Sequence, residues 1–222
     1  MIELNHVNKK YGRNQILNDV CLCANAGQSI AIVGKNGCGK STLLQIMAGI
    51  LSPDAGSIRY FDQDVLKNKK CFKKYCGYVP QDNPLLEELS VKDNLRLWGW
   101  NSKHPHNDLL QQLELYDILD KSVSCLSGGM KRRVSIACAV FLQPSLVLLD
   151  EPTTALDVYH KDKVQSWITD YCKGNGIVIM TTHDEKEIMS ADRCMIMLDG
   201  KLVELTDKTE RWNQIRAYIM EK

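Results

Sequence analysis

The sequence lacks any apolar run long enough to cross a membrane. Its best candidate, Val134–Leu142, is half of the roughly 18 residues that a transmembrane helix needs. A secretion signal is also missing, because the chain opens on an alternating strand pattern and not on a charged segment followed by an apolar one. We therefore expect an intracellular, cytoplasmic protein that reaches a membrane only through a partner.

The sequence has almost no net charge. Its 28 Lys and Arg residues nearly balance its 27 Asp and Glu residues, which leaves a formal net charge of +1. This balance argues against a nucleic-acid partner held by a broad basic surface. Two short basic runs, Lys67–Lys70 and Lys131–Arg133, have an ordinary interpretation as a solvated loop and a solvated helix face, and we favour it for the first.

The nine cysteines show no second pair at the spacing of a zinc site. Cys71 and Cys76 flank a lysine-rich turn, so we expect no metal site there. The thiols of a cytoplasmic chain are expected to be reduced. Cys21 and Cys23 alternate on a predicted strand, so they share one face, which we expect to face the core.

The length of 222 residues fits a single α/β domain with an inserted subdomain. Ser90 and Asp93 resemble a capping box, and Val91, Leu95 and Trp98 follow at helical spacing without strand-like alternation. We predict a helical subdomain over about residues 89–142, with these apolar residues in its core. Residues 1–88 and 143–222 would then form the catalytic core and a β subdomain.

A glycine-rich loop lies between a predicted strand at 29–33 and a helical pattern. It consists of Gly34, Lys35, Asn36, Gly37, Cys38, Gly39, Lys40, Ser41 and Thr42. The glycines allow backbone N–H groups and the helix N-terminus to point at a polyphosphate. Lys40 can reach the β- and γ-phosphates, and the Ser41 hydroxyl can ligate Mg²⁺. Kinases, GTPases and motor ATPases all carry such loops, so the loop alone indicates only a nucleotide phosphate.

A second potential anion site precedes a helix that we predict over Lys131–Leu142. Ser127 is suited to cap this helix, and Gly128 and Gly129 leave its first N–H groups uncovered. The alternative is a simple capped helix with a flexible entry. That alternative explains the serine but not the paired glycines, because glycine in a first turn costs stability.

Two carboxylates end a continuous apolar run. Leu146–Glu151 is typical of a buried parallel strand, and it delivers Asp150 and Glu151 to the sheet edge that presents the glycine-rich loop. Asp150 is placed to organise Mg²⁺, and Glu151 is a candidate to orient or deprotonate an attacking water. A solvated acidic turn before Pro152 is the alternative, which the otherwise apolar strand disfavours.

Three further residues are expected near the same edge. Gln81 lies between two prolines just after a predicted strand, and His183 follows another strand end, where α/β sheets bind ligands. A lone histidine is usually structural, but His183 could contact a phosphate. Tyr11 could stack on a nucleotide base or be an ordinary half-exposed strand tyrosine.

Taken in order and spacing, these segments resemble the nucleotide-binding subunit of bacterial ATP-binding-cassette (ABC) transporters over Ile2–Val203. The serine–glycine–glycine segment separates this family from kinases and GTPases with similar loops. The sequence departs from the family at Met130, where glutamine is usual, and methionine cannot make the hydrogen bonds of glutamine.

The resemblance implies a P-loop NTPase (RecA-like) core with an N-terminal antiparallel β subdomain and an inserted helical subdomain. It implies ATP and Mg²⁺ as cofactors, with Glu151, His183 and Gln81 as catalytic residues. Adenine would stack on Tyr11. The glycine-rich loop, Ser127, Gly128, Gly129 and Asp157 would bind the nucleotide, and Ser41, Gln81 and Asp150 would serve Mg²⁺.

The resemblance also implies a head-to-tail homodimer or heterodimer of ATPase subunits, with each ATP between one glycine-rich loop and the other subunit's Ser127–Gly129. Integral membrane permease subunits would hold the dimer on the inner face of the cell membrane and would take up the motion that ATP hydrolysis powers. Compact cassettes of this kind resemble subunits of bacterial exporters more than sugar or metal importers, so we expect export. A soluble ATPase switch that remodels a macromolecular complex is the alternative, and a nucleotide-binding protein without turnover is a third.

Overall fold

The computed structural model describes residues 1–101 and 107–220. An antiparallel sheet has the order β2-β1-β4-β5. Its strands are β1 (Ile2–Tyr11), β2 (Asn14–Ala24), β4 (Ala55–Tyr60) and β5 (Gln63–Asp64). A second, larger sheet has the order β10-β9-β3-β8-β7-β6. Its strands are β3 (Ser29–Val33), β6 (Cys76–Val79), β7 (Leu146–Asp150), β8 (Ile177–Thr181), β9 (Arg193–Leu198) and β10 (Lys201–Glu204).

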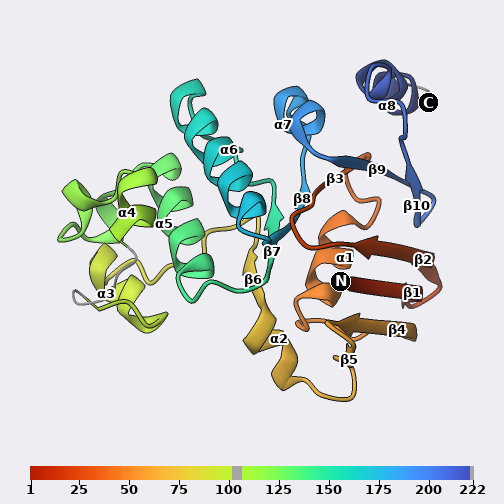
Figure 1. Ribbon diagram of the computed structural model, residues 1–222, viewed down its shortest axis with the longest axis horizontal. Coiled ribbons are helices and arrows are strands. Elements are labelled where there is room, and N and C mark those ends of the chain that lie inside the picture. The colour runs from red at the N-terminus through yellow and green to blue at the C-terminus, as the bar shows by residue number, and fades with distance from the viewer. Residues whose placement is uncertain (102–106, 221–222) are drawn as a thin grey trace.

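Helices surround the larger sheet, in which the strands from β9 to β6 run parallel. They are α1 (Lys40–Met47), α2 (Lys70–Tyr75), α3 (Val91–Leu97), α4 (Asn107–Gln112), α5 (Gly128–Val140), α6 (Val158–Lys173), α7 (Glu185–Ser190) and α8 (Arg211–Met220). Figure 1 shows α3, α4 and α5 together on one side of the molecule, with the antiparallel sheet on the other side.

Successive side chains of the central strands point alternately into two separate hydrophobic clusters, one on each face of the sheet. Ile30 and Ile32 of β3 pack with α1 and the antiparallel sheet, whereas Ala31 and Val33 pack with α5, α6 and α8. Strands β7 and β8 alternate in the same way, because successive side chains of a strand point to opposite faces. Helices α1 and α5 therefore cover opposite faces of the sheet.

The predicted helical segment contains α3, α4, α5 and two 3₁₀ turns, Tyr116–Ile118 and Val123–Cys125. The Ser90 hydroxyl accepts a hydrogen bond from the backbone N–H of Asp93 and donates one to its carboxylate, so the predicted cap of α3 is confirmed. Val91 and Leu95 are buried, but the prediction for Trp98 is wrong because this residue follows the end of α3 and is half exposed.

Two other predictions are corrected. Cys21 and Cys23 do share one face of β2, but it is the exposed face, because Val20, Leu22 and Ala24 on the other face fill the core. Helix α5 begins at Gly128 and ends at Val140, earlier than predicted at both ends, which leaves Leu142 exposed. Among the described residues, no helix combines the length and apolar character that crossing a bilayer requires.

Candidate functional site

The glycine-rich loop joins β3 to α1 at the carboxyl edge of the central sheet. Two of its glycines are required by close packing. A Cβ at Gly34 would lie 2.8 Å from the Cys38 Sγ atom, and Gly39 adopts a φ of 108° with a Cβ position 2.9 Å from Ile16 Cγ2. Few side chains tolerate such a φ, so glycine at position 39 lets the end of the loop pack closely on Ile16 of β2.

The start of α1 has the features of an anion site. Its N-cap is Gly39, with no side-chain cap hydrogen bond, which leaves the first N–H groups for an external acceptor. Lys40 is buried, and its ammonium donates to the carbonyl oxygens of Gly34 at 2.7 Å and Lys35 at 3.1 Å. This ammonium is therefore folded back against the backbone of the loop. Ser41 and Thr42 in the first turn are partly exposed.

Thr181, at the end of β8, hydrogen-bonds both Asp150, the last residue of β7, and Glu151, which follows it. Its hydroxyl donates to an Asp150 carboxylate oxygen at 2.5 Å and accepts the backbone N–H of Glu151 at 3.0 Å. Asp150 is only 3% exposed. Glu151 has a left-handed φ of 51°, an uncommon conformation for a residue other than glycine, which turns its side chain out of the strand direction.

The Glu151 carboxylate lies at the meeting point of three other groups. Gln81 Nε2 is 3.4 Å from Glu151 Oε2, the Thr154 hydroxyl donates to the same oxygen at 3.1 Å, and His183 Nε2 is 3.8 Å from Oε1. Burial and the Lys40 ammonium lower the pKa of His183, although Glu151 opposes this. The three predicted catalytic residues are thus brought together, and His183 is neutral at pH 7.

A buried arginine underlies this cluster. Arg132 of α5 donates to the backbone carbonyl oxygens of the two segments that carry Gln81 and Glu151. The acceptors are the carbonyl oxygens of Pro80, Gln81, Asp150, Glu151 and Pro152. Burial lowers the pKa of Arg132 despite the nearby Asp150 and Glu151 carboxylates. The interpretation of Lys131–Arg133 as a solvated face does not hold, because Arg132 and Arg133 are buried.

Sequence analysis missed Arg132. Its only signal is a position two residues before the apolar stretch of the helix that begins at Val134, where a charged side chain without partners would be costly.

The second predicted anion site lies at the start of α5. The Ser127 hydroxyl accepts the backbone N–H of Met130 at 3.3 Å, which confirms the predicted cap. Ser127 and Gly128 are exposed, and a Cβ at Gly128 would meet nothing within 4 Å. The Met130 side chain packs against the core. A Cβ at Gly129 would lie 3.3 Å from the Ala155 carbonyl oxygen, so this segment packs beside the turn that follows Glu151, on the face of the sheet opposite α1.

The last two predicted site residues, Tyr11 and Asp157, contact residues close to them in the sequence. Tyr11 is 48% exposed at the end of β1, next to the turn into β2, and the Lys9 ammonium lies 5.6 Å from its ring centroid. Asp157 caps α6 by accepting the backbone N–H of His160 at 2.9 Å. This hydrogen bond, followed by the one from the His160 ring, lowers the pKa of Asp157.

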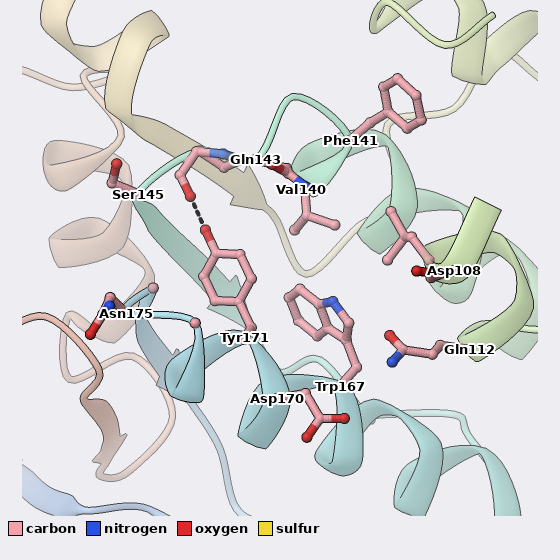
Figure 2. A pocket seen from close by; sticks show the side chains of 14 residues that line it. Asp108, Gln112, Val140, Phe141, Gln143, Ser145, Trp167, Asp170, Tyr171 and Asn175 are labelled. Carbon is pink, nitrogen blue, oxygen red and sulfur yellow. Dashed lines mark hydrogen bonds between the residues drawn. The ribbon is translucent and has the colours of Figure 1, made fainter. Parts of the chain in front are cut away.

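A cavity lies elsewhere. It has a volume of about 540 Å³ and is lined by residues of α4, α5 and α6 together with the segments that enter β7 and β8. Figure 2 shows Trp167 and Tyr171 forming one wall. Ser145 and Gly176 mark the amino ends of their strands, so this cavity is at the edge opposite the predicted site.

The comparisons with known proteins agree with the order of these segments. The ABC transporter family matches residues 17–154, which include the glycine-rich loop, Gln81, Ser127–Gly129 and Glu151. The chain belongs to this family. A P-loop core with an antiparallel β subdomain, ATP binding and ATP hydrolysis are therefore confirmed for this ABC ATPase.

Among its relatives, the sulfate/thiosulfate import ATP-binding protein of Pectobacterium atrosepticum is 33% identical over 96% of this chain and 68% of the relative. The spermidine/putrescine import ATP-binding protein of Spiroplasma citri is 33% identical over 96% of this chain and 63% of the relative. The chain thus spans about two thirds of the length of these relatives. Both names refer to import, so the expectation of export finds no support.

Solved structures show the same architecture. The ATP-binding subunit of an ABC transporter superposes with a TM-score of 0.86 at 25% identity, covering 97% of this chain and 94% of that chain. A dimeric ATP-binding cassette in a post-hydrolysis state, bound to ADP and phosphate, superposes with a TM-score of 0.82 at 26% identity, covering 92% and 98%.

Proposed function

We propose that this ABC ATPase drives a membrane permease by closing and opening a head-to-tail dimer around two ATP molecules. The observation that carries the proposal is the separation of two anion-binding helix starts in one chain. The start of α1 lies beside the catalytic cluster, whereas the exposed Ser127–Gly129 segment belongs to a helix on the other face of the central sheet. A second subunit, identical or related, can bring its own Ser127–Gly129 to the phosphates.

ATP binding follows from the chemistry of the loop. The N–H groups from Gly34 to Thr42 would surround the β- and γ-phosphates, and Lys40 would supply the positive charge from below. The exposed ring of Tyr11 would stack on adenine. Asp157 would approach the nucleotide from the loop before α6.

The donor set beside the loop fits Mg²⁺. The Ser41 hydroxyl, the Gln81 amide oxygen and the Asp150 carboxylate are hard oxygen ligands of the kind that Mg²⁺ prefers. Asp150 is buried at the strand end and is oriented by Thr181, which suits a carboxylate that serves a cation. When bound, Mg²⁺ would neutralise charge that develops on the phosphate oxygens.

Hydrolysis would use the cluster around Glu151. Its carboxylate orients or deprotonates the attacking water, and Gln81 and Thr154 hold that carboxylate through their hydrogen bonds. His183, neutral at pH 7, contacts the γ-phosphate as a hydrogen-bond donor. Such positioning and electrostatic stabilisation supply most of phosphoryl-transfer catalysis. Loss of the γ-phosphate removes the bridge between the subunits, and the dimer opens.

The permease would contact an exposed apolar surface on the segment over residues 89–142 and the residues just before it. This surface consists of Leu86, Leu97, Trp98 and Leu142, each at least half exposed. Asn94 ties the backbone of Leu86 to α3, and a Cβ at Gly99 would lie 3.0 Å from Leu142. Exposed apolar surface of this kind favours a protein partner. Through Gln81 and the helical segment, the nucleotide site would move the permease from the inner face of the membrane.

Affinity purification from detergent-solubilised membranes of the chain's own host tests this function. The tagged chain should recover a polytopic membrane protein, and Trp98→Asp should lose that protein while it keeps ATP binding. An extracellular solute-binding protein that belongs to the same complex would assign import, the direction that the names of the relatives favour. Recovery of soluble complexes alone would overturn the proposal in favour of a remodelling switch.

A further inference from the structure

Strands β1 and β2 carry two facing irregularities on their exposed side. The register pairs Leu4 with Leu22 and Val7 with Val20, so Asn5 and His6 together face the single residue Cys21. The next register step pairs Lys9 with Leu17. Asn18 and Asp19 of β2 therefore face the single residue Asn8 of β1. Each is a β-bulge, a device that re-aims side chains and often lies beside functional sites.

Both bulges place a residue other than glycine in the left-handed region. The φ angle is 53° at His6 and 58° at Asp19, and such angles persist only where the surroundings fix them. Asn8 provides part of that support, because its side-chain amide donates to the His6 carbonyl oxygen at 2.8 Å and accepts the Asp19 backbone N–H at 3.1 Å. Gly56 of β4 packs on the His6 backbone so closely that its Cβ position lies 2.5 Å from the His6 carbonyl oxygen.

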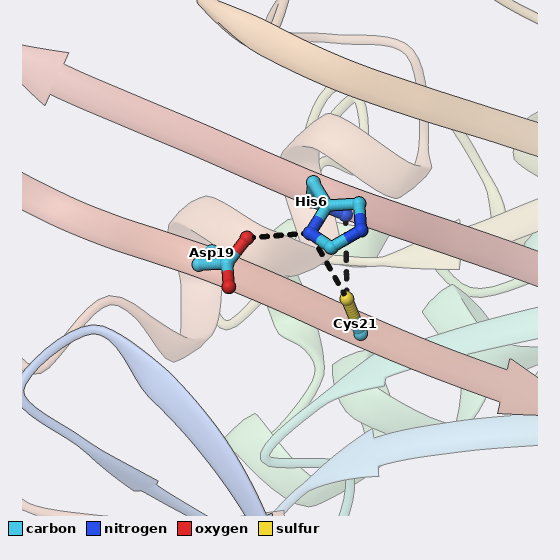
Figure 3. Close-up of side chains that lie close together, drawn as sticks. All are labelled: His6, Asp19 and Cys21. Atoms are coloured by element: carbon cyan, nitrogen blue, oxygen red, sulfur yellow. Dashed lines mark hydrogen bonds and ion pairs between the residues drawn. The ribbon is translucent and has the colours of Figure 1, made fainter.

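The result of these bulges is a convergence of three metal-ligand types. His6 Nδ1 lies 2.7 Å from Asp19 Oδ1 and 3.9 Å from Cys21 Sγ, and the three ligand atoms all lie within 4.8 Å of one another. Figure 3 shows both side chains directed at the same ring nitrogen of His6. In addition, the His6 backbone N–H donates to Cys21 Sγ at 3.3 Å.

We propose that His6, Asp19 and Cys21 form a binding site for Zn²⁺ on the exposed face of the antiparallel sheet. Imidazole, carboxylate and thiolate are the ligands that Zn²⁺ uses, at about 2.0–2.3 Å each. Tetrahedral coordination would separate the nitrogen from the oxygen by about 3.3 Å and from the sulfur by about 3.6 Å. To reach these values the nitrogen–oxygen distance would lengthen by about 0.6 Å and the nitrogen–sulfur distance would shorten by about 0.3 Å. Water would complete the fourth position at this exposed site.

This site is separate from the ATP chemistry and does not depend on the proposed function. It does lie on the two strands that lead to Tyr11 and to Ile16, the residue that packs on Gly39. A bound Zn²⁺ would cross-link these strands and stabilise the folded chain, because it binds the folded state in preference to the unfolded one.

Titration of the reduced, metal-stripped full chain with Co²⁺, without nucleotide, tests the site. We expect a single Co²⁺ per chain, a thiolate-to-metal charge-transfer band, tetrahedral d–d bands, and displacement of Co²⁺ by Zn²⁺. His6→Asn and Asp19→Asn remove a ligand but tolerate a left-handed φ, and Cys21→Ser removes the thiolate. Loss of a hydrogen-bond partner of a metal ligand weakens metal binding by about 10- to 100-fold. Loss of a ligand itself should therefore lower the Co²⁺ affinity of each variant at least about tenfold.

Cys23→Ser is the matched control, since Cys23 is an exposed cysteine on the same strand outside the cluster. It should keep the full affinity and the charge-transfer band. Zn²⁺ should also raise the melting temperature of the wild-type chain and of Cys23→Ser, but not that of Cys21→Ser. A missing band, or a band unchanged in Cys21→Ser, would overturn the proposal and leave the cluster as a His6–Asp19 hydrogen bond beside a free thiol.

Discussion

At the scale of single residues, Arg132 joins the two segments that carry Gln81 and Glu151. It is 2% exposed, and its guanidinium spans the backbone of the Gln81 loop and of the Glu151 turn. We regard it as a positioning residue, because it contacts the predicted catalytic residues Gln81 and Glu151 only through their main chain. Arginine suits this role better than lysine, since its planar fork presents five donors in fixed directions.

We predict that Arg132→Lys lowers the turnover number about tenfold with little change in ATP affinity, because hydrogen bonds to a charged group that fix Gln81 and Glu151 are each worth about 1.5–3 kcal/mol. ATPase kinetics and equilibrium ATP binding check this. Arg133→Lys is the control, since Arg133 is equally buried on α5 but donates to the carbonyl oxygens of Leu113 and Glu114. Both variants should melt earlier, and equal losses of turnover would contradict a positioning role.

The lowered pKa of His183 predicts how ATP turnover depends on pH. Its pKa is lowered mainly by burial and also by Lys40, so the folded chain keeps it neutral to a lower pH than the unfolded chain does. Turnover that depends on neutral His183 should stay flat from pH 8 down to about 6.5, the ordinary histidine value, and fall only below it. The contribution of His183 to stability is likewise present above that pH and lost as the pH falls.

The pH–rate profile of wild type and His183→Gln checks this expectation. Glutamine keeps a hydrogen-bond donor and does not titrate, so the acid limb of the variant should lose its His183 component. A wild-type profile that already falls between pH 8 and 7, and that His183→Gln flattens, would mean that the pKa is raised and not lowered.

At the scale of elements, the capping residues could be predicted from sequence because caps are local, although α5 begins three residues before the predicted Lys131. Ser90, Ser127 and the glycine-rich loop each mark a helix start that the structure contains. The buried central strands could be predicted too, since continuous apolar runs such as Leu146–Leu149 are buried on both faces. The outward face of Cys21 and Cys23 could not, because alternation defines two faces and only packing decides which is buried.

The Ser127 cap at the start of α5 leads to a prediction about stability and turnover. Ser127→Ala should cost about 1 kcal/mol of stability, because it removes the acceptor for the Met130 N–H. It should also lower ATP turnover if Ser127–Gly129 faces the nucleotide of another subunit. Thermal unfolding and ATPase assays measure both effects.

Ser90→Ala is the matched control, since Ser90 caps α3 through the equivalent hydrogen bond to Asp93. It should cost a similar free energy and leave turnover unchanged. If the two variants lose turnover equally, the segment acts only as a helix cap.

At the scale of the whole molecule, sequence order placed Gln81, Glu151 and His183 at one edge, because the carboxyl ends of parallel strands meet there. The Arg132 contacts could not be predicted, since they join carbonyl groups of segments far apart in the chain and carry no residue-type signal. The cluster of His6, Asp19 and Cys21 depends on two β-bulges whose positions periodicity does not reveal.

The central claim is that two chains share each ATP, because one chain holds its two predicted anion-binding helix starts on different faces of the sheet. Glu151→Gln tests it most directly, because this change keeps the shape of the side chain and removes the carboxylate that would activate water. Light scattering during size-exclusion chromatography, with and without Mg²⁺ and ATP, measures the mass. We predict a dimer only with ATP, almost no turnover, and a monomer again when Ser127→Arg is added. A monomer that binds ATP, or turnover at the wild-type rate, would contradict the account.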